Sequence, residues 1–242
     1  MLFYKKQIVQ MLWYGPISTM ERLCIASHLK VGHEVHLYCY EPYDLPGVKL
    51  MDAREIIPED GIFAYSTGEE KGSFSAFSNC FRYKLLFERG NWWSDTDVIC
   101  LKRFDFTEDY VFASEKNKDG TQKPTTSVMK APVNSNLMRY CYQESISPSR
   151  NTLRWGTIGP KLLGQGVENY QLTAFVQPYH VFCPYDWFLS EVDPEGEIFA
   201  PTNMEHSYAI HLWQEMWRRA GLNKDGTYGE NTLYERLKRA IL

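Results

Sequence analysis

Two aspartates separated by one threonine, Asp95 and Asp97, are the residues whose types and spacing point most directly to chemistry. In an extended chain, side chains two residues apart point to the same side, so both carboxylates can face one cation. Mg²⁺ and Mn²⁺ prefer oxygen ligands and are often held by one or two carboxylates together with substrate phosphates. The pair therefore predicts a metal site for a nucleotide diphosphate. The alternative for so short a motif is a solvated acidic loop.

A periodic helix and a glycine turn precede the two acids. The helix is predicted over residues 73–89 and ends at Gly90. Residues 91–97 (NWWSDTD) are predicted to enter a strand that continues as VICL, which would present both carboxylates from one extended segment. The apolar stripe of the helix is Phe74, Phe77, Phe81 and Leu85, and its polar strip is Ser75, Asn79 and Arg82.

The rest of the chain alternates strands and helices. Residues 7–13 predict a strand, a helix capped by Ser18 or Thr19 runs to Gly32, and 34–40 predict a second strand, which together form a parallel crossover unit. Further strands are predicted at 110–114, at 126–130 and in SYAIHLW. Helices are predicted at 134–144 and 230–242, and a short helix is predicted in the Gly-rich segment WGTIGPKLLGQG. The segment PYHVFCPYDWF is predicted to be a strand or loop. We find no domain boundary and expect a single α/β domain over 1–242.

The segment FSNCFRYKLLFERGNWWSDTDVICLKRFD resembles a glycosyltransferase family known by its DXD sugar-binding region. Asn79 stands where that family has an acid, which keeps hydrogen-bonding capacity but removes the charge. Asn91 replaces a second glycine and can adopt the same left-handed backbone, and Trp93 replaces the usual tyrosine. The residues on the family's pattern are Arg82, Tyr83, Leu86, Gly90, Trp93, Asp95 and Asp97.

This resemblance implies a GT-A fold, a Rossmann-like domain with a mostly parallel mixed central sheet flanked by helices. Residues 1–115 would form the nucleotide-sugar-binding half, and 116–242 the acceptor-side half with the C-terminal helix. The implied activity is metal-dependent transfer of a sugar, with retention of configuration, from a nucleotide-diphosphate sugar such as a UDP-sugar. The implied acceptor is a glycan or lipid-linked glycan, as for bacterial capsular and surface polysaccharide glycosyltransferases.

The resemblance also implies a set of metal ligands. AIHLWQEMW resembles a late His-x-Trp segment of the family, so His211 would join Asp97 at the ion, and Asp95 would share the ion or bind the ribose or donor sugar. A nitrogen ligand shifts the preference from Mg²⁺ toward Mn²⁺. The expected cofactor is therefore Mn²⁺, with Mg²⁺ as the alternative. A lone histidine can equally be a structural residue.

Further segments imply substrate contacts. QMLWYG resembles the first strand and turn of the family, where Trp13 or Tyr14 would pack on the base, and WGTIGP resembles a Thr-Gly-Pro segment of the acceptor-side loops. Arg82 would bind the donor through charge-assisted hydrogen bonds. The expected substrate-binding residues are Trp13, Tyr14, Asn79, Arg82, Asp95, Thr157 and Gly159.

Asp186, in CPYDWF, is the candidate catalytic carboxylate. An acid among aromatic rings can have a raised pKa or face the anomeric carbon. The alternative is that Asp186 caps a helix that begins near Trp187, because aspartate is favoured at helix starts.

Composition narrows the class of protein. The chain has 242 residues and a formal net charge of −4, which argues against a nucleic-acid partner bound through a basic surface. No stretch approaches the roughly 20 apolar residues of a membrane span, and the N-terminus has no signal-peptide pattern. We expect a cytoplasmic protein. The six cysteines are scattered singly and are expected to be reduced and buried.

The C-terminal helix carries Arg236, Lys238 and Arg239 around an apolar face. It could contact an anionic membrane at the inner face, near a lipid-linked acceptor. The alternative is that it covers the domain's own core.

Two other functions use some of the same residues. A nucleotidyltransferase also needs paired acids and a metal, but the chain lacks a Gly-rich phosphate loop. A non-catalytic carbohydrate-binding module would use the tryptophan and tyrosine rings, but it has no need for Asp95 and Asp97 on one ion, and the strand-helix alternation opposes it.

Overall fold

The computed structural model describes residues 7–150, 153–187 and 204–242. Its centre is a six-stranded sheet with the order β3-β2-β1-β4-β7-β6. The strands β3, β2, β1 and β4 are parallel neighbours, whereas β7 is antiparallel to both β4 and β6. The mostly parallel mixed sheet confirms the predicted α/β class. Its strands are β1 (Ile8–Trp13), β2 (Glu34–Cys39), β3 (Lys49–Asp52), β4 (Asn91–Ser94), β6 (Val111–Lys116) and β7 (Gln122–Ala131).

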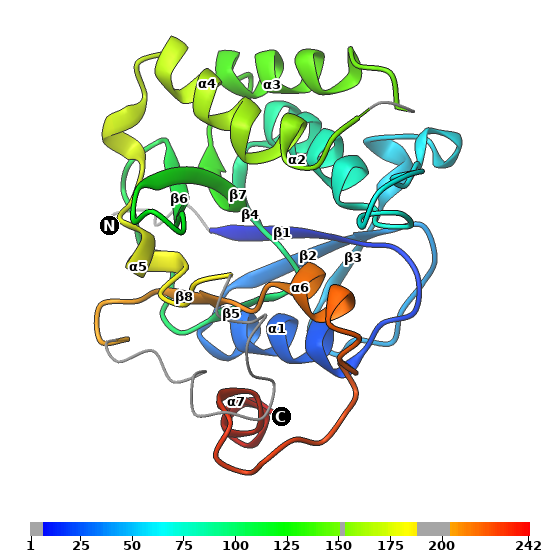
Figure 1. The fold of residues 1–242 in the computed structure, drawn as a ribbon, viewed down its shortest axis with the longest axis vertical. Helices are drawn as coiled ribbons and strands as arrows, with labels where there is room; N and C mark the ends of the chain where they lie inside the picture. The colour runs from blue at the N-terminus through cyan, green and yellow to red at the C-terminus, as the bar shows by residue number, and fades with distance from the viewer. Residues whose placement is uncertain (1–6, 151–152, 188–203) are drawn as a thin grey trace, which may run out of the picture.

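Helices cover both faces of this sheet (Figure 1). In that view α2, α3 and α4 lie above it, and α1 and α7 lie below it with a small second sheet of β5 (Val98–Cys100) and β8 (Ala209–His211). The helices are α1 (Thr19–Lys30), α2 (Ser75–Arg89), α3 (Asn136–Ile146), α4 (Leu162–Asn169), α5 (Tyr179–Phe182), α6 (Gln214–Arg219) and α7 (Leu233–Ile241). Single helical turns lie at Ala53–Glu55, Glu59–Gly61, Thr157–Lys161 and Thr173–Phe175.

Alternating side chains of β1 supply the two halves of the core. Val9 and Met11 are fully buried on the side of α1, where they share a cluster with Leu23. Leu12 belongs to the other cluster, with Phe81 of α2. The period of two residues along a strand places neighbours on opposite faces, so one short strand holds helices on both sides of the sheet.

The first crossover unit forms as predicted. Ser18 precedes α1, and its backbone N–H donates to the Glu21 carboxylate at 2.7 Å. This is the capping-box arrangement, which satisfies a backbone donor that the helix leaves unpaired. Asn91 lies just after the C-terminal end of α2 and has φ +75°, so the left-handed backbone expected for this residue is confirmed.

The prediction of one extended strand through Asp95 and Asp97 is wrong. β4 ends at Ser94, and the backbone turns so that the N–H of Val98 donates to the carbonyl of Asp95 at 3.2 Å. The chain thereby leaves the central sheet and forms β5, which pairs with β8 instead. The turn exists because β5 pairs with β8, a segment more than 100 residues away, and the local sequence pattern gives no sign of that pairing.

Other segments differ from expectation in smaller ways. The segment PYHVFCPYDWF, predicted as a strand or loop, contains the short helix α5. Lys49–Asp52 form an edge strand that was not predicted. All six cysteines are free and buried, as expected. In α7, Leu233 and Leu237 pack into the same cluster as α1, so its apolar face covers the domain's own core. No helix among the described residues is long and apolar enough to cross a bilayer.

Candidate functional site

A cavity of about 740 Å³ lies where β1 and β4 end. Ligands of open α/β sheets bind outside the carboxyl ends of the parallel strands, and this volume lies within the range typical of small-molecule sites. Seven of the residues predicted to bind metal or substrate line it, namely Trp13, Tyr14, Asn79, Arg82, Asp95, Asp97 and His211. These residues come from segments up to about 200 positions apart, and the fold brings them to one place.

The turn after β4 holds Asp95 in a fixed orientation. Its backbone N–H donates to the carbonyl of Ser127 on β7 at 2.8 Å, and the indole Nε1 of Trp93 donates to its carboxylate at 2.8 Å. The Arg82 guanidinium lies 3.0 Å from the same carboxylate and 4.8 Å from the centre of the Trp93 ring. An acid, a cation and an indole therefore form one packed unit.

Arg82 is occupied by protein partners. Besides Asp95, it donates to the carbonyl of Thr126 at 2.7 Å and to the carbonyl and the hydroxyl of Ser78 at 3.1 and 2.7 Å. It is only 4% exposed. Arg82 thus contacts the Asp95 carboxylate from the cavity wall, and the donor contact that the resemblance implies for Arg82 stays a prediction.

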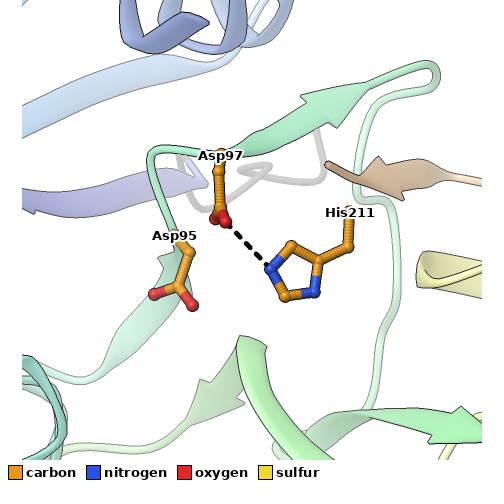
Figure 2. A group of neighbouring side chains, drawn as sticks. All are labelled: Asp95, Asp97 and His211. Carbon is orange, nitrogen blue, oxygen red and sulfur yellow. Dashed lines mark hydrogen bonds and ion pairs between the residues drawn. The ribbon is translucent and has the colours of Figure 1, made fainter. Parts of the chain in front are cut away.

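The pairing of β5 with β8 brings His211 to Asp97. Val98 pairs with His211 in the register, and the N–H of Leu212 donates to the carbonyl of Asp97 at 2.8 Å. As Figure 2 shows, the imidazole Nε2 then faces the Asp97 carboxylate, at 3.2 Å. The same carboxylate oxygen accepts the N–H of Gln214 at 2.8 Å, so the start of α6 is tied to the site as well.

The three side chains could hold a metal ion. One ligand atom each from Asp95, Asp97 and His211 can be chosen so that all lie within 4.8 Å of one another. Two ligands bound about 2.1 Å from an octahedral ion lie roughly 3 Å apart, close to the separation between His211 and Asp97. Two oxygens and one imidazole nitrogen fit Mn²⁺ and Mg²⁺ by ligand type, and the remaining positions would be left to substrate and water.

The charges in this cluster shift one another's pKa. Burial alone would raise the pKa of Asp97, but the His211 charge and hydrogen bond and the Gln214 N–H outweigh it, so the pKa is lowered. Burial raises the pKa of Asp95 against the opposing effect of Arg82. Burial would lower the pKa of His211, but Asp97 raises it well above its ordinary value. Asp97 is therefore ionised and His211 protonated, and a metal ion bound by both residues would replace the imidazole proton.

Trp213 fixes the position of His211. Its ring centre lies 3.8 Å from that of the imidazole, and its Nε1 donates to the carbonyl of Tyr185 at 2.9 Å. Its backbone has φ +57°, which is uncommon for a bulky residue. Such strain is retained where the surroundings over-determine it, often at functional sites. Here it lets the chain turn from β8 into α6 directly beside the cluster.

Trp13 and Tyr14 form one aromatic wall of the cavity. Tyr14 is 38% exposed and contacts the ring of Phe74 edge-on, at 5.0 Å between centres. The ammonium of Lys224 lies 4.8 Å from the Trp13 ring centre and pairs with the buried Glu21. A planar base could stack on such exposed ring faces. The side chain of Lys224 adds a positive charge nearby that the sequence patterns did not single out.

The predicted residues of the Thr-Gly-Pro segment lie behind the cavity wall. Thr157 and Gly159 do not line the cavity, whereas their neighbours Gly156 and Pro160 do. A Cβ on Gly159 would lie 2.9 Å from the amide nitrogen of Asn79. Gly159 therefore allows Asn79 its place at the wall, where its carbonyl oxygen accepts from the Thr126 hydroxyl.

Asp186 lies beside the cavity but does not line it. Its carboxylate pairs with the Lys116 ammonium at 2.8 Å. Glu115, which precedes Lys116 on β6, does line the cavity, and so does Lys123 of β7. Neither stood in a motif, because Glu115 directly follows the strand predicted over 110–114 and Lys123 precedes the strand predicted over 126–130. The alternation of side chains along β6 was the one available signal.

Comparison with known proteins gives structural likeness only. No family model and no curated protein matches the chain. The structure is similar to PaToxG glycosyltransferase, with 12% identity and a TM-score of 0.47 over 98% of this chain and 86% of that chain. A transferase mutant has 10% identity and a TM-score of 0.48, over 68% and 85% of the two chains.

Apo-form GlyE, a glycosyltransferase from Streptococcus pneumoniae TIGR4, has 11% identity and a TM-score of 0.43. The match covers 97% of this chain and 62% of GlyE, which is less than two thirds of that chain. TM-scores below 0.5 leave the function to be argued from the side chains of the site itself.

Proposed function

We propose that this protein is a metal-dependent glycosyltransferase of the GT-A type that uses a nucleotide-diphosphate sugar. One observation carries the proposal: Asp95, Asp97 and His211 converge on the wall of a cavity of about 740 Å³ at the end of the central sheet. The motif resemblance around Asp95 and Asp97 agrees with it. We further propose a UDP-sugar as donor, Mn²⁺ as the ion, and transfer with retention of configuration.

Different residues of the cavity would bind different parts of a nucleotide sugar and its metal ion. Asp97 and His211 would hold the ion, with Asp95 completing the set. When bound, the ion would supply positive charge against the departing diphosphate. Arg82 would act indirectly, because its hydrogen bonds keep the Asp95 carboxylate turned into the cavity. Trp13 and Tyr14 would stack on the base.

Incubation with a panel of nucleotide sugars and Mn²⁺, scored for slow donor hydrolysis, tests the proposal. We expect one donor to be cleaved to a nucleoside diphosphate, and we expect Asp97→Ala to abolish this turnover. Asp109→Asn is the control, since Asp109 is exposed and lies outside the cavity. Full activity of the folded Asp97→Ala variant would contradict the assignment.

The same incubation separates the two alternatives. A nucleotidyltransferase would release pyrophosphate or exchange the nucleotide rather than cleave the sugar from its diphosphate. A carbohydrate-binding module would leave every donor intact. The buried Asp97–His211 pair favours an enzyme over a module, because burying both groups is costly and sugar binding does not require it.

The acceptor side is proposed in coarser terms. We propose a glycan or lipid-linked glycan as the acceptor, with 1–115 supplying most of the donor contacts and 116–242 most of the acceptor contacts. Arg236 and Arg239 on α7 are exposed and could contact anionic lipids. Sedimentation with anionic vesicles at low salt tests this contact, and no binding there would remove it.

A further inference from the structure

We propose that Glu115 and Lys123 form the acceptor-binding subsite, in which the Glu115 carboxylate accepts a hydrogen bond from a saccharide hydroxyl. This inference rests on the proposed function and assigns a role to the part of the cavity wall that β6 and β7 supply. Glu115 is here a substrate-positioning residue. The assignment differs from the sequence-based candidate, Asp186.

The two residues form one pair at the cavity wall. Glu115 lies near the end of β6 and Lys123 opposite it on β7, in register. Their charged groups are 3.1 Å apart, and the side chains are 9% and 40% exposed, respectively. Both line the cavity. The carboxylate is thus largely withdrawn from water, while the ammonium reaches the open space.

The other carboxylates that line the cavity are already engaged. Asp95 is held by Arg82 and an indole N–H, and Asp97 by His211 and a backbone N–H. Glu215 takes hydrogen bonds from two arginines of α6.

Glu115 has a single polar partner among the described residues, the Lys123 ammonium, which contacts one of its two oxygens. Its other oxygen is therefore available to a ligand. A buried charge gains most from such an added hydrogen bond.

Position in the sheet assigns this pair to the acceptor. β7 lies between β4 and β6, so β6 is two strand spacings, about 10 Å, from β4, the strand that ends just before Asp95. A group bound at the metal ligands therefore leaves room for a sugar before Glu115 is reached. Saccharide hydroxyls both donate and accept hydrogen bonds. A carboxylate beside an ammonium offers an acceptor for the first role and a donor for the second.

The pair formed by Lys116 and Asp186 is the internal comparison. Lys116 follows Glu115 on β6, and successive side chains of a strand point to opposite faces. The Lys116 ammonium and the Asp186 carboxylate are 2.8 Å apart, and neither residue lines the cavity. Two adjacent residues of β6 thus each form an ion pair, and only the pair of Glu115 with Lys123 lines the cavity.

The test compares Glu115→Gln with wild type in three assays of the full chain. These are binding of UDP with Mn²⁺, hydrolysis of the donor that wild type cleaves, and transfer from that donor to a panel of p-nitrophenyl glycosides. We expect binding and hydrolysis to stay within about twofold. We expect kcat/KM for the glycoside to fall roughly 10- to 100-fold, the loss of one hydrogen bond to a charged group.

Two further variants support the comparison. Lys123→Met should raise KM for the glycoside while hydrolysis is retained. Glu144→Gln, an exposed carboxylate on α3, is the matched control and should leave all three assays unchanged. Equal thermal midpoints of Glu115→Gln and wild type would exclude misfolding as the cause, and a variant that does not fold is replaced by Glu115→Asp.

Each remaining outcome counts against the proposal. Unchanged transfer by Glu115→Gln, an equal loss of hydrolysis and transfer, or a loss of transfer in Asp186→Asn alone would overturn it. Donor hydrolysis by wild type without transfer to any glycoside would overturn the saccharide acceptor. If wild type binds and cleaves no donor with Mn²⁺, the proposed function itself fails, and this inference fails with it.

Discussion

Arg82 is a residue whose chemistry depends on its shape rather than on its charge alone. Its planar guanidinium contacts Asp95, Ser78 and Thr126 at once. The single ammonium of lysine cannot reproduce these directions. We expect Arg82→Lys to weaken Mn²⁺ binding about 10- to 100-fold, as for other partners that orient a metal ligand. Titration with Mn²⁺ by electron paramagnetic resonance measures the change.

The control for this change is Arg89→Lys. Arg89 also faces an acid, Glu55 at 3.3 Å, but its side chain is 50% exposed. Exposed pairs of this kind contribute little, so Mn²⁺ affinity should not change. Wild-type affinity in a folded Arg82→Lys variant would show that Asp95 needs no such support.

Gly159 offers a second test at the scale of one residue. A methyl group there would lie 2.9 Å from the Asn79 amide nitrogen and would push this side chain from the wall. We expect Gly159→Ala to raise KM for the donor several-fold. In Gly164→Ala the nearest atom would be 3.9 Å away, in Pro124, so this variant should match wild type. Steady-state kinetics of both variants decide the point, and equal KM values would show that Asn79 does not serve the donor.

At the scale of an element, α1 carries a histidine that makes the fold sensitive to acid. Burial lowers the pKa of His28 to about 3, and burial together with Arg103 lowers the pKa of His33 to about 4. Both fall below the value of the unfolded chain, so the unfolded state binds more protons between pH 6.5 and 4. Stability should therefore fall as pH falls below 6.5, by about 2 kcal/mol from His28 between pH 8 and 5.

Urea unfolding of wild type and His28→Leu at these two pH values measures that contribution. The variant should lose less stability than wild type on acidification. His206→Gln replaces an exposed histidine and should keep the wild-type pH dependence. An identical slope in all three proteins would mean that His28 is protonated in the folded state.

The elements also show how far local pattern determines structure. The period of α2 and its Gly90 end were predictable, because a helix depends on residues near in sequence. β3, with the sequence KLMD, was missed because it is short and mostly exposed and gains its stability by pairing with β2. The turn at Thr96 was missed for the same reason, since it exists where β5 leaves one sheet to join another.

Some residues of the site could be predicted from the sequence and others could not. Asp95, Asp97 and His211 could be found because they stand in segments that resemble known motifs. Glu115 could not, since a glutamate in a strand becomes significant only when the strand is placed beside a cavity. The contact of Arg82 with Asp95 likewise depends on the packing of α2 against β7 and the turn after β4, which no spacing along the chain contains.

At the scale of the whole molecule, metal binding should stabilise the fold, because the three ligands come together only in the folded state. Mn²⁺ at 100 times its dissociation constant adds about 2.7 kcal/mol. For a chain of this size that corresponds to roughly 5 to 10 °C in the unfolding midpoint. We expect this rise on adding Mn²⁺ after EDTA treatment, measured by differential scanning calorimetry.

Asp97→Asn should show no such rise, whereas Asp109→Asn should respond like wild type. A Mn²⁺-dependent rise that persists in Asp97→Asn would place the ion elsewhere on the protein.

The hydrogen bond between Asp97 and His211 joins residues 114 positions apart. Such a contact closes a long loop, which is a slow and late event in folding. The helices can form while this junction is still open, so regain of circular dichroism during refolding should precede regain of Mn²⁺ binding. A nascent chain that ends before residue 211 carries the aspartates without their histidine, so binding of the ion by all three ligands requires synthesis to continue past residue 211.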